Sequence, residues 1–137
     1  MKKVLFVCTG NTCRSAMAQG IFNRVIKERK IEARASSCGL CAQEGAPATP
    51  EAVNALAEID IDIQGHRARS ISEELVKTAD LIIPMTESHR AVIARMFGCE
   101  KLAPAAGISD PFGGDIEIYR RCRDQLLEMC EKLADTI

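Results

Sequence analysis

The 137-residue sequence has no surplus of charge and no long hydrophobic run. It contains 18 lysines and arginines and 19 aspartates and glutamates, which gives a formal net charge of −1 at pH 7. This balance argues against nucleic acid or an anionic membrane as a partner, and no block of like charge indicates an interaction tail. The apolar run from Val4 to Val7 has four residues. It is shorter than a signal-peptide core (~7–15 residues) or a membrane span (~20 residues).

Seven cysteines are present without a secretion signal. We therefore expect free thiols in the reducing cytoplasm, most of them buried as small apolar residues, including Cys99, Cys122 and Cys130. Cys38 and Cys41 form a C-x-x-C pair, which zinc sites use. Zinc prefers four ligands, however, and no second pair or paired histidines accompany these two. No metal or other cofactor is expected.

Strand-like and helix-like segments alternate along the chain, without a linker or an internal repeat. The apolar run ending at Cys8 predicts a buried strand, and from Ser15 the apolar residues recur every four positions, as on a helix. Asp115 is expected to cap a last helix with the inner face Ile118, Cys122, Leu126, Met129 and Leu133. Further strands are expected at residues 33–38, 81–83 and 102–104. Further helices are expected at residues 51–58 after the N-cap Thr49, at residues 73–78 after the N-cap Ser72, and from Ser88 or Thr86 to about Phe97.

This alternation predicts an α/β protein in which a parallel sheet carries helices on both faces. The length fits a single three-layer domain over residues 1–137, with right-handed crossovers. Ligands in such folds bind beyond the carboxyl ends of the strands. Cys8 stands at such an end, so the loop after it is the first place to look for a site.

The loop after the first expected strand places a cysteine and an arginine, Cys8 and Arg14, with five residues between them. Backbone N–H groups of a loop at a helix N-terminus form a nest that binds a tetrahedral oxyanion. The helix and Arg14 both favour a Cys8 thiolate, and Arg14 can hold two phosphate oxygens. Gly10 permits close approach to phosphate, Asn11 tolerates a left-handed backbone and can brace the loop, and Ser15 can donate to the sulfur. These residues predict phosphoryl transfer to sulfur.

An acid for the leaving group, and later a base for water, is also needed. Asp110 is the best candidate, because Pro111 and the following glycines shape a loop that could fold over the site. On the residues alone, Asp110 could equally be a turn aspartate. The two histidines, His66 and His89, are expected to cap helices or brace loops.

These features together resemble the low-molecular-weight protein tyrosine phosphatase family over essentially the whole chain. The match consists of residues 7–15, the Met17-Ala18 pair and the Asp110-Pro111 pair. The resemblance implies a four-stranded parallel sheet of phosphotyrosine phosphatase I-like, flavodoxin-like topology and a metal-free, two-step reaction. Cys8 would form a phosphocysteine, and Asp110 would act first as acid and then as base. His66 would lie beneath the loop. The phosphate would be held by Arg14 and the loop residues Thr9, Gly10, Asn11, Thr12, Cys13 and Ser15.

Two positions affect the expected substrate. Thr12 replaces the bulky aliphatic residue usual in tyrosine-directed members, and Phe112 follows Pro111 where those members carry tyrosines that line a deep slot. Both features resemble the bacterial protein arginine phosphatases of the family. A threonine hydroxyl and the Asp110 carboxylate can accept guanidino N–H groups. We therefore expect a monomeric enzyme that removes inorganic phosphate from phosphoarginine in proteins, with phosphotyrosine as the alternative substrate.

Thiol redox chemistry is the alternative from another class. Cys8 and Cys13 are close enough in sequence to form a disulfide, and Cys13 could then protect the nucleophile from over-oxidation. Arsenate reductases that share the loop need a further cysteine pair on the segment that is here residues 82–89, which has none. A catalytically inactive phosphate-binding protein is a third interpretation, which the presence of nucleophile, arginine and acid disfavours.

Overall fold

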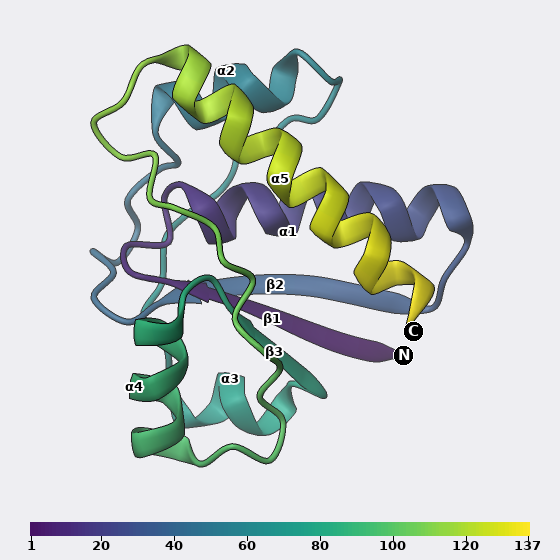
Figure 1. Ribbon diagram of the computed structural model, residues 1–137, viewed down its shortest axis with the longest axis vertical. Coiled ribbons are helices and arrows are strands. Elements are labelled where there is room, and N and C mark those ends of the chain that lie inside the picture. Colours follow the sequence, from purple (N-terminus) through teal and green to yellow (C-terminus); the bar gives the residue numbers. More distant parts are fainter.

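A computed structural model describes all 137 residues and shows three layers (Figure 1). A parallel sheet lies between α1, α2 and α5 on one face and α3 and α4 on the other. The α/β class predicted from the alternating pattern is confirmed. The elements in chain order are β1 (Lys2–Cys8), α1 (Arg14–Arg29), β2 (Ala33–Gly39), α2 (Pro50–Ala57), α3 (Glu73–Thr78), β3 (Leu81–Pro84), α4 (Glu87–Phe97) and α5 (Ile116–Asp135). None of the helices is long and apolar enough to cross a membrane.

The sheet has three strands in the order β2-β1-β3, so β1 is its centre. Cys8 pairs with Gly39 of β2 at the carboxyl edge. The expected fourth strand at residues 102–104 is reduced to a single bridge between Ile82 and Leu102. Lys101 O and the Ala103 N–H each bond to Ile82 at 2.9 Å. The next bond of this parallel ladder would run from residue 84 N to Ala103 O, but Pro84 has no N–H, and its carbonyl oxygen accepts from Ala106 N instead, so the strand does not develop.

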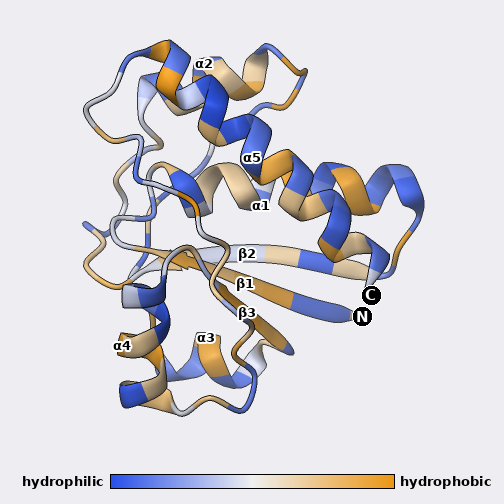
Figure 2. Cartoon of the chain, in the orientation of Figure 1, coloured by the Kyte–Doolittle hydropathy of each residue, from blue (hydrophilic) through white to orange (hydrophobic).

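The central strand separates two apolar cores. Alternate residues of β1 face opposite sides, and Figure 2 shows the strand as apolar along its C-terminal half. Val4 and Phe6 join the larger core under α1 and α5, whereas Leu5 and Val7 join the smaller core over α3 and α4. Because both cores hold β1 in place, the loop that follows Cys8 starts from a rigid support.

Helix N-caps follow the sequence signals. Thr49, Ser72, Thr86 and Asp115 each accept a backbone N–H of the first turn through the side chain. These bonds satisfy amide groups that would otherwise lack a partner, and they set where each helix begins.

Two expectations about burial are wrong. The buried face of α5 consists of Tyr119, Cys122, Leu126, Cys130 and Ala134, while Ile118 is 44% exposed and Met129 and Leu133 are only partly buried. Ile118 instead packs over the turn at Gly114, close enough that a Cβ on the glycine would lie 2.9 Å from it. Cys99 is exposed in the turn after α4, where no apolar element covers it.

Candidate active site

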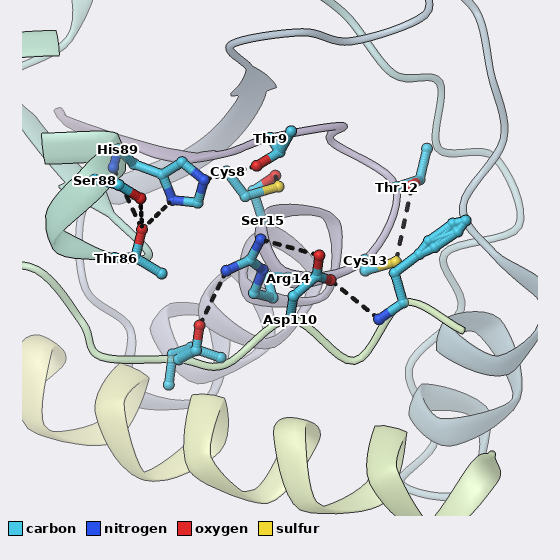
Figure 3. A network of polar contacts seen from close by, with 12 residues as sticks. Cys8, Thr9, Thr12, Cys13, Arg14, Ser15, Thr86, Ser88, His89 and Asp110 are labelled. Atoms are coloured by element: carbon cyan, nitrogen blue, oxygen red, sulfur yellow. Dashed lines mark hydrogen bonds and ion pairs between the residues drawn. The ribbon is translucent and has the colours of Figure 1, made fainter. Parts of the chain in front are cut away.

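The loop between β1 and α1 borders a cavity of about 240 Å³ at the carboxyl edge of the sheet. Eight of the ten residues predicted for the site line this cavity: Cys8, Thr9, Gly10, Thr12, Cys13, Arg14, Asp110 and Phe112. The other two, Asn11 and Ser15, are fully buried behind the loop. Residues from the two ends of the sequence thus meet in one place (Figure 3).

The Cys8 sulfur receives hydrogen bonds from two directions. The Asn11 N–H donates to Cys8 Sγ at 3.3 Å, and Ser15 Oγ lies 2.8 Å from the same atom. The Asn11 side-chain amide donates to Ser15 Oγ at 2.8 Å, so the serine proton is available to the sulfur, which lies closer than its other acceptor, the Cys38 carbonyl oxygen at 3.5 Å. Donors aimed at sulfur favour the thiolate, the form that attacks.

Asn11 braces the loop as the sequence predicted. It adopts a left-handed backbone with φ of 57°, and its Nδ2 also donates to Ser37 Oγ at 2.9 Å. Its Oδ1 accepts the Arg69 N–H at 3.1 Å. One buried side chain therefore ties the loop to α1, β2 and the segment before α3.

His66 lies beneath the loop, where the family resemblance had suggested it. Its Nε2 is 2.7 Å from the Asn11 carbonyl oxygen, which only accepts, so Nε2 carries the proton and donates. Burial lowers the pKa of His66, although the bond to Asn11 opposes that shift. The neutral ring is the form that the fold favours.

His89 braces the other side of the loop. Its Nε2 lies 2.8 Å from Thr9 Oγ1, and its Nδ1 lies 3.0 Å from Thr86 Oγ1 at the start of α4 (Figure 3). Burial lowers the pKa of His89, nearby Arg14 lowers it further, and Asp110 raises it. The sequence predicted a capping or bracing role but not the contact with Thr9, which is 80 residues away.

Gly39 lies against the loop with no room for a side chain. A Cβ at this position would lie 2.5 Å from the Thr9 carbonyl oxygen and 3.0 Å from the Asn11 nitrogen. The adjoining residues bond to the loop, since Leu40 N–H donates to Cys8 O and Cys41 N–H to Thr9 O, both at 2.9 Å. The sequence indicated Gly39 only as the end of a strand, and this close approach was missed.

Arg14 and Asp110 meet across the cavity. Arg14 is buried and donates through Nη1 to the Ile108 carbonyl oxygen at 3.1 Å, while its Nη2 lies 3.6 Å from Asp110 Oδ2. The Phe112 N–H donates to Asp110 Oδ1 at 3.0 Å and fixes the turn. The Asp110 side chain stays 54% exposed and Phe112 66% exposed. A carboxylate accessible to both water and the cavity can exchange protons with either.

Comparisons with known proteins extend over nearly the whole chain. Residues 3–137 match the family model described as low molecular weight phosphotyrosine protein phosphatase. The protein-arginine-phosphatase of Bacillus subtilis (strain 168) is 39% identical over 141 residues, covering 96% of this chain and 93% of the relative. A crystal structure of a low molecular weight protein tyrosine phosphatase from T. tengcongensis has a TM-score of 0.95 at 38% identity and covers 100% of both chains. A mutant of the YwlE arginine phosphatase with a phosphorylated active-site serine has a TM-score of 0.93 at 37% identity, covering 98% of this chain and 94% of that one.

Proposed function

Because the chain belongs to the low molecular weight phosphotyrosine protein phosphatase family, we propose that it hydrolyses phosphoarginine in proteins through a phosphocysteine intermediate, without a metal ion. The observation that carries this proposal is that Thr12 and Asp110 line the same cavity as Cys8 and Arg14. Relatives named protein-arginine-phosphatase support it at 39% and 34% identity. We further propose that residues 1–137 act as a single monomeric domain in the cytoplasm.

In the first step the Cys8 thiolate attacks phosphorus, and the bond from phosphorus to the guanidino nitrogen breaks. Arg14 and the loop amides hold the three equatorial oxygens, whose charge they stabilise where it develops. Asp110 donates a proton to the departing nitrogen. The Arg14 guanidinium lies 3.6 Å from Asp110 Oδ2. A bound phosphoryl group competes for the guanidinium and so frees the Asp110 carboxyl group for proton transfer.

In the second step Asp110, now a carboxylate, takes a proton from a water molecule. The water oxygen attacks phosphorus, the bond from phosphorus to sulfur breaks, and inorganic phosphate leaves. Ser15 and the Asn11 N–H stabilise the departing Cys8 thiolate through the contacts at 2.8 and 3.3 Å. The same donors therefore assist sulfur as nucleophile and as leaving group.

Thr12 supports phosphoarginine rather than phosphotyrosine. The guanidino group behind the phosphorus carries N–H donors that need acceptors once they leave water. The hydroxyl of Thr12 and a carboxyl oxygen of Asp110 are suitable acceptors. An aliphatic side chain in place of Thr12 leaves a donor unpaired, which costs roughly 1–3 kcal/mol, or about 5- to 150-fold in rate.

Phosphotyrosine remains the second candidate substrate. The exposed Phe112 ring at the cavity offers an apolar surface that a phenyl group can contact. The T. tengcongensis structure, at 38% identity, carries the tyrosine phosphatase name. Both candidates use the same phosphocysteine chemistry, so only the leaving group distinguishes them.

The test compares two peptides of one sequence that carry either phosphoarginine or phosphotyrosine. We expect wild type to have the higher kcat/KM for phosphoarginine, and Thr12→Ile to lower that value about 5- to 150-fold relative to phosphotyrosine. Thr12→Ser keeps the hydroxyl and serves as the matched control that retains the preference. A wild type that hydrolyses phosphotyrosine equally well or better contradicts the arginine assignment.

A further inference from the structure

A buried polar cluster behind Thr12 has no part in the two chemical steps. Tyr119 of α5 is 1% exposed, and its hydroxyl lies 3.3 Å from Cys13 Sγ and 3.3 Å from Thr49 Oγ1. Cys13 belongs to the phosphate loop, and Thr49 caps α2. The cluster therefore joins two helices to the residue next to Thr12.

The hydrogen bonds of this cluster have a direction. Thr49 Oγ1 accepts the Ala52 N–H at 3.3 Å, and its own proton points to the Tyr119 oxygen. The Tyr119 proton is then left for the Cys13 sulfur. Burial raises the pKa of Tyr119 above its ordinary value, so the hydroxyl keeps this proton at neutral pH.

The chain of donors ends on Thr12. Cys13 Sγ lies 3.8 Å from Thr12 Oγ1, within reach of a weak bond from a thiol (Figure 3). Thr49 Oγ1 is also 3.8 Å from the sulfur, but it already bonds to the Ala52 N–H and to Tyr119, whereas the contact with Cys13 is the only side-chain bond of Thr12 Oγ1. This contact therefore orients the Thr12 hydroxyl, and with Tyr119 donating to the sulfur the Cys13 thiol can donate to the Thr12 oxygen. One lone pair of that oxygen is then occupied, and the other remains for the substrate.

The backbone of Thr12 is held by the same elements. The Thr49 N–H donates to the Thr12 carbonyl oxygen at 3.0 Å. Thr49 therefore holds the main chain of Thr12 directly and its side chain through Tyr119 and Cys13. Cys8, Asn11 and Ser15 are joined by contacts of their own, none of which involves this cluster.

We propose that Tyr119 is a positioning residue for substrate selection, which orients the Thr12 hydroxyl through Cys13 so that it accepts from a guanidino group. This inference rests on the proposed function. Tyr119 touches neither the substrate nor the reacting atoms. Its contribution is the orientation of one acceptor, so its loss should affect phosphoarginine more than phosphotyrosine.

The experiment measures kcat/KM of wild type, Tyr119→Phe, Thr12→Val and the double variant on the paired phosphoarginine and phosphotyrosine peptides. Tyr119→Phe keeps the ring and removes only the hydroxyl. We expect it to lower the ratio of phosphoarginine to phosphotyrosine kcat/KM about three- to tenfold. In a Thr12→Val background the same change should alter the ratio less than about twofold, because the acceptor that it orients is gone.

Two further variants separate positioning from stability. Leu126→Val trims a buried residue on the same face of α5 and should lower stability while leaving the ratio unchanged. Cys13→Ala removes the sulfur that links Tyr119 to Thr12. It should reduce the ratio of phosphoarginine to phosphotyrosine kcat/KM as Tyr119→Phe does, and it provides a second test if Tyr119→Phe folds poorly.

The role of Tyr119 is refuted if Tyr119→Phe lowers kcat/KM for both peptides equally, or if its effect and that of Thr12→Val on the ratio multiply. A Cys13→Ala ratio equal to wild type also refutes it. A wild type that prefers phosphotyrosine contradicts the proposed function, and the inference with it. A wild type that prefers phosphoarginine and keeps this preference in Tyr119→Phe contradicts the role of Tyr119 alone.

Discussion

Gly39 offers a sharp test of how the sheet supports the phosphate loop. Its backbone lies so close to the loop that a methyl group added by Gly39→Ala would meet Thr9 O at 2.5 Å, Asn11 N at 3.0 Å and Ala42 Cβ at 3.1 Å. The φ angle of Gly39 is not in the left-handed region. Any effect of the substitution therefore comes from space and not from backbone strain.

The geometry sets the size of the effect. Ordinary contact begins near 3.4 Å, so the Thr9 carbonyl and the new methyl group must separate by about 0.9 Å. Neither side moves freely, because Cys41 N–H bonds to Thr9 O and Gly39 N–H bonds to Arg69 O, both at 2.9 Å. Overpacking of this kind costs about 1–3 kcal/mol of stability. A shift of nearly 1 Å in a loop that positions phosphate lowers kcat/KM by about 10- to 100-fold.

Gly20→Ala provides the matched control. A Cβ there would meet Ile63 Cγ2 at 2.8 Å, and Ile61 Cγ2 and Leu56 Cδ1 at 3.3 Å. All three are side-chain methyl groups and none belongs to the loop, whereas the new methyl group of Gly39→Ala would meet backbone atoms of the loop itself. Alanine is also more favourable than glycine inside a helix, by about 1 kcal/mol.

The assay combines urea unfolding with kcat/KM on a phosphoarginine peptide. We expect Gly39→Ala to lose both stability and activity, and Gly20→Ala to keep activity within about twofold. Wild-type kcat/KM in Gly39→Ala, or an equal loss of activity in both variants, would show that Gly39 does not position the loop.

Two further predictions concern the hydrogen bonds around the loop. Ser15→Ala removes one of the two donors to Cys8 Sγ. We expect kcat, measured by stopped flow, to fall about 10- to 100-fold, because a hydrogen bond to a charged group contributes about 1.5–3 kcal/mol. An unchanged kcat would argue against a thiolate stabilised by Ser15. Burial holds the pKa of His66 below its ordinary value, so the unfolded chain binds more protons and the free energy of unfolding falls as the pH drops below about 6.5. Urea unfolding between pH 7 and 5 should show that the free energy of unfolding falls less steeply with decreasing pH in His66→Gln than in wild type. Part of the pH dependence should remain, because burial lowers the pKa of His89 as well. The same pH dependence in both proteins would contradict this assignment.

Local sequence signals predicted the parts of the fold that depend on neighbouring residues. The apolar run to Cys8 and the N-caps at Thr49, Ser72 and Asp115 act within one turn or strand, and the structure has them where they were expected. The inner face of α5 was displaced toward Ile118, because hydrophobicity alone does not say whether a side chain covers the core or a neighbouring turn.

Long-range contacts were beyond the reach of sequence patterns. The spacing of Cys8 and Arg14 and the Asp110-Pro111 pair indicated which residues gather around the cavity. The contact of His89 with Thr9 and that of Tyr119 with Cys13 join residues 80 and 106 positions apart. A single sequence carries no signal for such pairs, since each depends on how the helices pack on the sheet.

Transfer of a phosphoryl group from arginine to Cys8 can be observed directly. The enzyme is mixed with a phosphoarginine peptide, the reaction is stopped with acid within the first turnover, and the phosphoryl group is mapped by mass spectrometry. We expect phosphocysteine at Cys8 in wild type and none in Cys8→Ala. Release of phosphate without a phosphorylated Cys8, or a phosphoryl group on another residue, would contradict it.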